Sequence, residues 1–369
     1  MDKRKKGLFL IQLPPPVHGV SVINQWIIES KIINENFKID AINLATARTI
    51  ADIGKQGLYK YIKLLSIYSK VLFRLLINKY NFIYITLSPT GSAFVKDSFL
   101  ILLGRLFSLK VIIHLHGKGI NKYLQNSNKI ILKFYNWVFK NSYVIHLSNS
   151  LMKDIELISS YKKQFVVPNG IPIKISDVKK NNKEVSILHL SNLIESKGGL
   201  TLLKAVNVLL TEKTSNFHLN VVGAWGDEDY KIRFQSYLKN NNLESVVSVH
   251  GALFGKEKHE ILSSSHIFVL PTYYPNECFP LTILEALQAG LPVISSFEGA
   301  IPEIIEEAIN GFLVDSQNEI ELANKIKLLI ESETLRKSMG QKARESYQTK
   351  FAFSIFENNL LNVFKEVLN

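Results

Sequence analysis

The stretch LPTYYPNECFPLTILEALQAGLPVI occupies residues 270–294 and carries most of the information about the fold. It begins at the end of an apolar run, passes through a polar loop and enters a helical pattern at Leu281. Gly290 stands where a glycine commonly ends a helix, and Pro292 follows two residues later. The stretch therefore predicts a strand, a loop, a helix over Leu281–Ala289 and a second strand.

The same alternation of short apolar runs and helical patterns continues along the chain in both directions. In the first half the runs are Leu8–Leu13, Phe82–Leu87, Val111–Leu115, Tyr143–Leu147 and Phe165–Val167. In the second half they are Ser186–Leu190, His218–Val222, Val246–Val249, Ile267–Leu270 and Val293–Ser295. Strands that alternate with helices form parallel sheets. The sequence predicts an α/β protein with two doubly wound, Rossmann-like domains that face each other across a ligand-binding cleft.

The polar segment Ile171–Glu184 reads as a linker between these domains. We therefore predict an N-terminal domain over residues 1–172 and a C-terminal domain over residues 173–350. The last stretch, residues 351–369, has an amphipathic helical pattern and is expected to pack back on the first domain.

Two carboxylates flank the predicted start of the helix at Leu281. The N–H groups of Leu281 and Thr282 lack helical partners and are positioned for a phosphate. Glu285, one turn further in, can accept two hydrogen bonds from a ribose diol, whereas Glu277 precedes the phosphate site and is positioned for hydroxyls of an attached sugar. Taken singly, Glu285 would only stabilise the helix dipole and Glu277 would only be a solvated loop residue. As a pair in this context they predict a nucleotide-sugar site.

This segment resembles the signature of the family 4 retaining glycosyltransferases, in which two glutamates are separated by seven residues. The matching positions are Glu277, Phe279, Pro280, Glu285, Gly290 and Pro292. The resemblance covers the second half through 167–171, 191–198, 299–303 and 310–314, and is highly specific there. The first half matches at fewer points, through 14–20, 88–91 and 114–117. The resemblance implies the GT-B fold, a C-terminal donor domain and an N-terminal acceptor-side domain. It also implies a retaining, metal-independent hexosyltransferase that needs no cofactor and uses a UDP-sugar as its donor substrate.

By this resemblance, Lys197 and an arginine five residues earlier would bind the donor diphosphate, with Phe279, Pro280, Leu281 and Thr282 beside it. Asn192 occupies the arginine's position here. Stabilisation of the leaving group is then expected from Lys197 as a point charge and from backbone N–H groups. The alternative for Lys197 is a solvated loop lysine.

The first half contributes two further site residues by resemblance. Gly19 follows the first strand, where the family has a glycine loop that closes over the donor. His116 ends the run Val111–Leu115 and is expected to contact the transferred sugar, although a locally bonded histidine is the alternative. Glu277, His116 and Lys197 are thus the predicted catalytic residues.

No metal site is predicted. The acidic triplet Asp227-Glu228-Asp229 superficially resembles a metal-binding motif, but we interpret it as a solvated turn. The nine histidines and the single cysteine, Cys278, show no metal-ligand spacing.

Charge is distributed unevenly along the chain. Residues 1–170 hold 24 Lys or Arg against 8 Asp or Glu, a net charge of +16, whereas the rest of the chain carries −4. No nucleic-acid-binding motif is present, so an anionic membrane surface is the preferred partner of the basic half. The basic amphipathic stretches Leu58–Tyr80, with Lys60, and Lys129–Lys140 support this reading, with ordinary sheet-packed helices as the alternative. No apolar run reaches the roughly 18 residues of a membrane span. A cytoplasmic protein, peripheral on the inner face of the membrane, is expected.

These features together predict transfer of a sugar to a glycan or lipid-linked acceptor in bacterial surface polysaccharide synthesis, such as capsule or O-antigen. The resemblance implies that retention would follow from attack on the face from which the leaving group departs. The alternatives are a non-catalytic GT-B scaffold, a sugar-nucleotide epimerase of GT-B fold, and a binding module that uses only the basic half. The base, the sugar, the acceptor and the oligomeric state are left open by the sequence.

Overall fold

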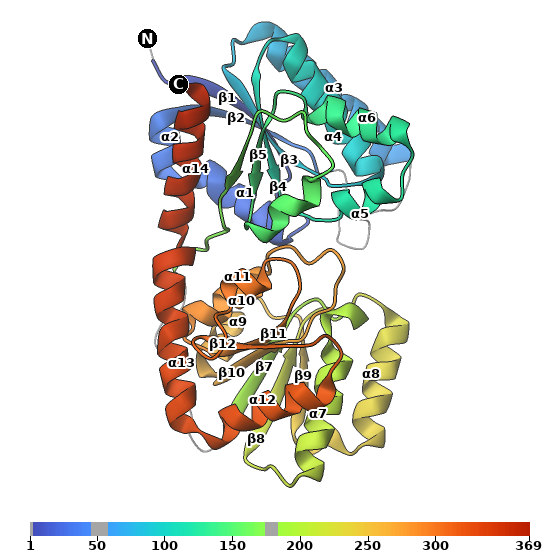
Figure 1. Ribbon diagram of the computed structural model, residues 1–369, viewed down its shortest axis with the longest axis vertical. Coiled ribbons are helices and arrows are strands. Elements are labelled where there is room, and N and C mark those ends of the chain that lie inside the picture. Colours follow the sequence, from blue (N-terminus) through green and yellow to red (C-terminus); the bar gives the residue numbers. More distant parts are fainter. Residues whose placement is uncertain (1–2, 46–57, 174–183) are drawn as a thin grey trace. The chain divides into compact units, whose positions relative to one another are not determined.

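A computed structural model describes residues 3–45, 58–173 and 184–369, apart from the side chains of residues 58–60. It divides into two compact units, Met1–Asn169 with Ser354–Asn369, and Gly170–Phe353 (Figure 1). The sequence prediction places these breaks at residues 172 and 350. Most of the predicted linker and the side chain of Lys60 lie outside the described residues.

The first unit is built on a six-stranded parallel sheet in the order β2-β1-β3-β4-β5-β6. Its strands are β1 (Lys5–Ile11), β2 (Phe37–Asn43), β3 (Phe82–Leu87), β4 (Lys110–Leu115), β5 (Tyr143–His146) and β6 (Lys163–Val166). All six residues of β3 are buried, as expected of a strand covered on both faces.

Helices cover both faces of this sheet. They are α1 (Gly19–Glu29), α2 (Lys31–Asn36), α3 (Leu58–Ile77), α4 (Gly91–Leu106), α5 (Ile120–Gln125), α6 (Lys129–Phe139), the 3-10 turn η2 (Ser150–Ile155) and α14 (Phe353–Leu368). Helices α3, α4, α5 and α6 share one apolar core with residues of β1, β3, β4 and β5. Helix α14 packs on the opposite face, where the ring of Phe364 lies 5.8 Å from that of Phe9 and 5.5 Å from that of Phe82. The last helix of the chain therefore completes the first unit.

The second unit repeats the architecture with the strand order β12-β11-β10-β7-β8-β9, all parallel. The strands are β7 (Val185–Leu190), β8 (Phe217–Val222), β9 (Val247–Gly251), β10 (Ile267–Leu270), β11 (Val293–Ser296) and β12 (Gly311–Val314). The α-helices are α7 (Gly199–Thr211), α8 (Glu228–Asn240), α9 (Gly255–Ser264), α10 (Leu281–Gln288), α11 (Ile301–Ile304), α12 (Glu319–Glu331) and α13 (Glu333–Ser346). The shorter turns are η3 (Glu195–Lys197), η4 (Leu243–Ser245) and η5 (Tyr347–Phe351).

The structure confirms the predicted α/β class and the two parallel sheets. Two strands, β2 and β12, are absent from the sequence prediction, and both lie at sheet edges. Polar residues such as Lys38 and Asp40 interrupt β2, as a partly solvated edge strand permits. Strand β12, in contrast, is a largely buried apolar run of four residues that the prediction did not include. Among the described residues, no helix is both long enough and apolar enough to cross a bilayer.

Candidate functional site

Two loops at the carboxyl ends of neighbouring strands meet in the second unit. The first follows β7 and contains η3, and the second follows β10. The N–H of Tyr273 donates to the carbonyl oxygen of Ser196 at 2.7 Å, and the Thr272 hydroxyl donates to the same oxygen at 3.2 Å. Gly198 adopts φ +79°, and a Cβ there would lie 2.1 Å from the carbonyl oxygen of Pro271. Only glycine permits this conformation and this approach.

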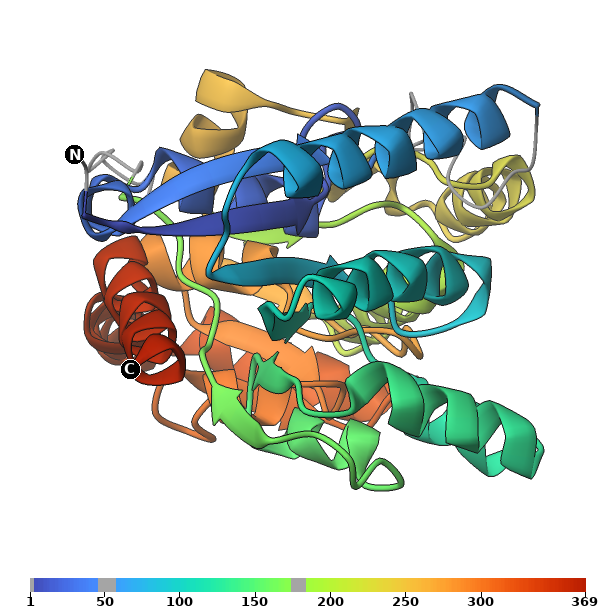
Figure 2. The same cartoon turned by 90° about the horizontal axis from the view of Figure 1, so that it is seen from above.

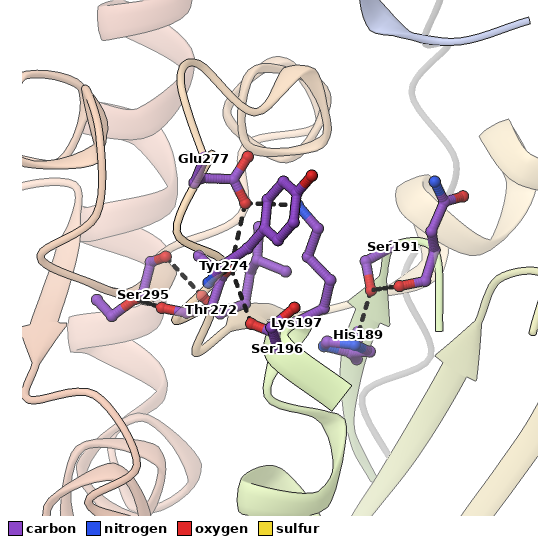
Figure 3. Close-up of polar contacts among 11 residues, drawn as sticks. His189, Ser191, Ser196, Lys197, Thr272, Tyr274, Glu277 and Ser295 are labelled. Atoms are coloured by element: carbon purple, nitrogen blue, oxygen red, sulfur yellow. Dashed lines mark hydrogen bonds and ion pairs between the residues drawn. The ribbon is translucent and has the colours of Figure 1, made fainter. Parts of the chain in front are cut away.

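The two loops bring Lys197 and Glu277 together (Figure 3). The Lys197 ammonium lies 2.5 Å from Oε2 of Glu277, and the Thr272 hydroxyl lies 3.1 Å from the same oxygen. The side chains of Lys197 and Glu277 are only 15% and 8% exposed. Lys197 also lies over the ring of Tyr274, 5.0 Å from its centroid. Sequence reasoning assigned both residues to one ligand, and the structure places them in direct contact.

The loop that carries Glu277 is also held on its other side. Gly299 has φ +56°, and a Cβ there would lie 2.3 Å from the carbonyl oxygen of Glu277. The N–H of Ala300 donates to the carbonyl oxygen of Cys278 at 2.8 Å. The Glu277 backbone is therefore fixed between the β7 and β11 loops, a rigidity that favours preorganised electrostatics.

Helix α10 begins at Leu281, as the sequence predicts. Its N-cap residue is Pro280, which makes no side-chain capping hydrogen bond. The amides of Leu281 and Thr282 thus point from an uncapped helix start, the arrangement that favours an anion. Phe279 and Pro280 are buried, and the Phe279 ring packs 6.0 Å from that of Phe351. These two residues support the helix start from the core.

Glu285 forms a second ion pair, which sequence reasoning missed. Lys258 of α9 places its ammonium 2.6 Å from Oε1 of Glu285, with side-chain exposures of 25% and 21%. Oε2 of Glu285 is buried and has no hydrogen-bond partner in the described structure. A buried carboxylate oxygen without a partner is costly, which makes this atom a candidate ligand contact. No motif marks Lys258, because its position depends on how α9 packs.

Asn192 lies beside a buried histidine but does not supply a positive charge. Its backbone oxygen accepts a hydrogen bond from the Ser191 hydroxyl at 3.2 Å. That hydroxyl lies 3.0 Å from Nε2 of His189, whose Nδ1 lies 2.9 Å from the carbonyl oxygen of Val269 (Figure 3). Burial lowers the pKa of His189 to about 4, so this ring is neutral at pH 7.

The remaining predicted residues lie in the first unit. Gly19 is the first residue of α1, and His18 caps this helix by accepting from the N–H of Ser21. His116 follows β4, and its ring centroid lies 4.0 Å from that of His114. Burial and the nearby His18 lower the pKa of His116 to about 3, and its Nε2 is buried without a hydrogen-bond partner. A neutral imidazole with an unpaired nitrogen is suited to an uncharged hydroxyl.

The acidic triplet has a structural role in the second unit. Asp227 caps α8 and accepts from the N–H groups of Asp229 at 2.7 Å and Tyr230 at 3.2 Å. Across the described ranges, no group of three or more His, Cys, Asp or Glu side chains could hold a metal ion.

Comparison with known proteins places these features in context. Residues 171–346 match the family model "Glycosyl transferases group 1". N-acetyl-alpha-D-glucosaminyl L-malate synthase of Bacillus anthracis is 26% identical over 70% of this chain and 68% of its own length. The amylovoran biosynthesis glycosyltransferase AmsK of Erwinia amylovora is 25% identical over 55% of this chain, which spans only about half of AmsK.

Solved structures match the fold over its whole length. A glycosyltransferase from Rickettsia africae has a TM-score of 0.75 at 18% identity and covers 100% of both chains. HepE of Anabaena, solved in complex with UDP, has a TM-score of 0.74 at 18% identity and covers 98% of this chain and 100% of its own. At 18% identity this likeness is one of fold. The two six-stranded parallel sheets described above have the GT-B fold.

Proposed function

We propose that the protein is a family 4 retaining glycosyltransferase that transfers a hexose from a UDP-sugar. The observation that carries the proposal is the buried contact between Lys197 and Glu277, held by two rigid loops. HepE, which shares the fold, was solved with UDP and with UDP-glucose. The E-x(7)-E spacing of Glu277 and Glu285 adds support, because it separates a sugar-side carboxylate from a nucleotide-side carboxylate.

Donor binding in this proposal uses three groups of the second unit. Oε2 of Glu285 accepts from a ribose hydroxyl, because Lys258 already occupies Oε1. The amides of Leu281 and Thr282 donate to the diphosphate at the start of α10. The Lys197 ammonium has three N–H donors, and one is used by Glu277, so it can also donate to a phosphate oxygen.

The chemical step breaks the bond between the anomeric carbon and the diphosphate oxygen. Negative charge develops on the diphosphate, where Lys197 and the α10 amides stabilise it. Glu277 holds sugar hydroxyls while the ring gains positive charge. The acceptor hydroxyl attacks from the face that the diphosphate leaves, and its proton passes to the leaving phosphate oxygen. The configuration at the anomeric carbon is thereby retained.

Lys258 offers an answer to the substitution at Asn192. The arginine that the family has at position 192 is replaced by Asn192 here, but Lys258 of α9 pairs with Glu285, the carboxylate assigned to the nucleotide. In this proposal Lys258 orients Glu285 and offsets its charge when an anionic nucleotide binds. The reaction requires no metal ion and no cofactor, since these lysines and the helix start supply the positive field.

The acceptor proposed is a glycan or lipid-linked glycan of a bacterial surface polysaccharide such as capsule or O-antigen. Relatives named for amylovoran and colanic acid biosynthesis support this class. Such an acceptor would place the enzyme in the cytoplasm, at the inner face of the cell membrane.

The test is ligand binding followed by turnover. A panel of nucleoside diphosphates and UDP-sugars should raise the Tm of the full chain, with UDP compounds giving the largest shift, because a ligand that binds only the folded state stabilises it. UDP release from the stabilising UDP-sugar should persist in excess chelator. A thermal shift without UDP release in the presence of any acceptor would favour the scaffold alternative, and no shift by any nucleotide would refute donor binding.

A further inference from the structure

Exposed apolar side chains concentrate on three neighbouring helices of the first unit, α3, α4 and α6. More than half of the large hydrophobic side chains that are exposed in the described part of the chain lie on them. Leu65 and Leu76 of α3 are 65% and 67% exposed, Leu106 of α4 is 79% exposed and Trp137 of α6 is 50% exposed. The three helices, coloured light blue, teal and green, run side by side in Figure 2. Patches of this kind mark interaction surfaces.

A groove of about 600 Å³ runs along α3 and α4. Its walls are mainly apolar and include Tyr61, Leu64, Val95, Phe99, Leu103 and Leu106. Tyr68 also lines the groove, and its hydroxyl donates to the carbonyl oxygen of Lys96 at 3.0 Å. Burial and the nearby Asp97 raise the pKa of Tyr68 to about 12, so the ring carries no charge. Ser92 and Lys96 also line the groove, and the Lys96 ammonium pairs with the buried Asp97 at 3.0 Å. The mainly apolar walls are suited to a hydrocarbon chain.

The surroundings of the groove are cationic. Helices α3, α4, α5 and α6 contain one carboxylate, Asp97, which is fully buried and accepts from the N–H of Ser88 at 3.0 Å. Lys70, Lys129 and Lys133 are exposed on the same helices. A surface that combines exposed apolar groups, exposed lysines and no exposed carboxylate complements an anionic bilayer.

We propose that the outer faces of α3, α4 and α6 dock on an anionic lipid bilayer, with an acyl chain entering the α3–α4 groove. The proposal rests on the proposed function only for its purpose, which is access to a lipid-linked acceptor. Packing on the sheet does not explain the exposed apolar side chains. The inner faces of these helices already pack in the core through residues such as Val71 and Val138. The lysines bring the protein to the lipid headgroups, and the groove holds it there.

The experiment is flotation of the full chain with vesicles of phosphatidylcholine alone or with added phosphatidylglycerol. Wild type should bind the anionic vesicles, and more weakly as salt rises. Phe99→Glu places a charge in the groove at a residue that is 54% exposed, and should weaken binding at least about tenfold. Ile320→Glu on α12, also 54% exposed, is the matched control and should bind as wild type does.

Measurements of folding and of oligomeric state accompany the flotation assay. A melt followed by circular dichroism should show both variants folded. If Phe99→Glu is unfolded, Leu106→Ser at the exposed rim replaces it. Wild-type binding by Phe99→Glu, or no vesicle binding by wild type, would overturn the proposal. If wild type is a dimer and Phe99→Glu is a monomer, the groove is a dimer interface and not a lipid site. The vesicle assay needs no donor, so it stands even if nucleotide binding fails.

Discussion

The two units share one architecture but differ in the side chains near the carboxyl ends of their strands. In the second unit, the loops after β7 and β10 hold the Lys197–Glu277 ion pair, and α9 and α10 hold the Lys258–Glu285 pair. In the first unit, His114 of β4, His116 directly after it and His146 of β5 have pKa values that are lowered mainly by burial. Paired charges suit a ligand that is itself charged, whereas neutral rings suit uncharged hydroxyls. The two units therefore differ in the side chains that they place near their strand ends and not in their fold.

Acid should affect the two units unequally. The pKa is lowered well below 6.5 at His114, to about 3 at His116 and to about 4 at His146. In the second unit, burial lowers the pKa of His189 to about 4 and also lowers that of His250. The unfolded chain binds these protons near pH 6.5 and the folded chain does not, so stability is full above pH 6.5 and falls as pH drops towards 4. Each histidine should remove about 1.4 kcal/mol per pH unit.

Hydrogen exchange of the full chain at pH 7 and pH 5.5, corrected for the chemical exchange rate, checks this difference. Peptides from β3 to β5 should lose protection before those from β7 to β10. His146→Gln removes one of the titrating groups and should flatten the pH dependence in the first unit alone. Simultaneous loss of protection in both units would mean that the buried histidines do not set acid stability.

Within the second unit, the largest effect on activity is expected at Glu277. Glu277→Gln keeps the size of the side chain but removes the charge near the developing positive sugar, so transfer should fall by about 10²-fold or more. Affinity for UDP should stay nearly constant. Steady-state rates and calorimetric UDP binding measure the two quantities.

Glu212→Gln is the control, because Glu212 lies outside this site and also pairs with a lysine, Lys327, at 2.8 Å. It should leave transfer unchanged. Loss of UDP binding in Glu277→Gln with intact turnover at saturation would mean that the roles of Glu277 and Glu285 are reversed.

Glu285 should have the complementary effect. Glu285→Ala removes the charge-assisted hydrogen bonds to the ribose and should weaken UDP binding by about 1–3 kcal/mol. Glu285→Gln should lie between this variant and wild type. The Kd for UDP, measured by calorimetry, tests the prediction, and an unchanged value in the alanine variant would exclude Glu285 from the nucleotide site.

The smallest expected effect is at Lys258. Its pair with Glu285 is partly solvated, so Lys258→Ala should weaken UDP binding by about 1 kcal/mol or less. Lys256→Ala, on the same helix but 90% exposed, is the control and should bind UDP as wild type does. Equal Kd values for both variants would show that Lys258 does not orient Glu285.

Features that depend on neighbouring residues in the sequence were predicted better than those that depend on tertiary packing. The start of α10 at Leu281 was predictable because a proline precedes it and a glycine and a proline follow its end. The edge strand β2 was missed because polar residues interrupt its apolar pattern, whereas β12 was missed although its four residues, GFLV, form an apolar run. The Lys258–Glu285 pair was also missed, since it joins residues 27 positions apart on different helices. Contacts of this kind depend on tertiary packing, and no spacing in the sequence predicts them.

The order in which the chain leaves the ribosome gives α14 a further significance. Its Phe364 covers Phe9 and Phe82 of the first unit, yet it is synthesised only after all of Gly170–Phe353. Helix α1 already packs on this face through Asn24, which donates to the Thr86 hydroxyl at 3.3 Å, but the part around Phe9 and Phe82 gains its cover only after the second unit has emerged. Nascent chains usually complete their N-terminal domain first. Here the first unit to be started is the last to be finished.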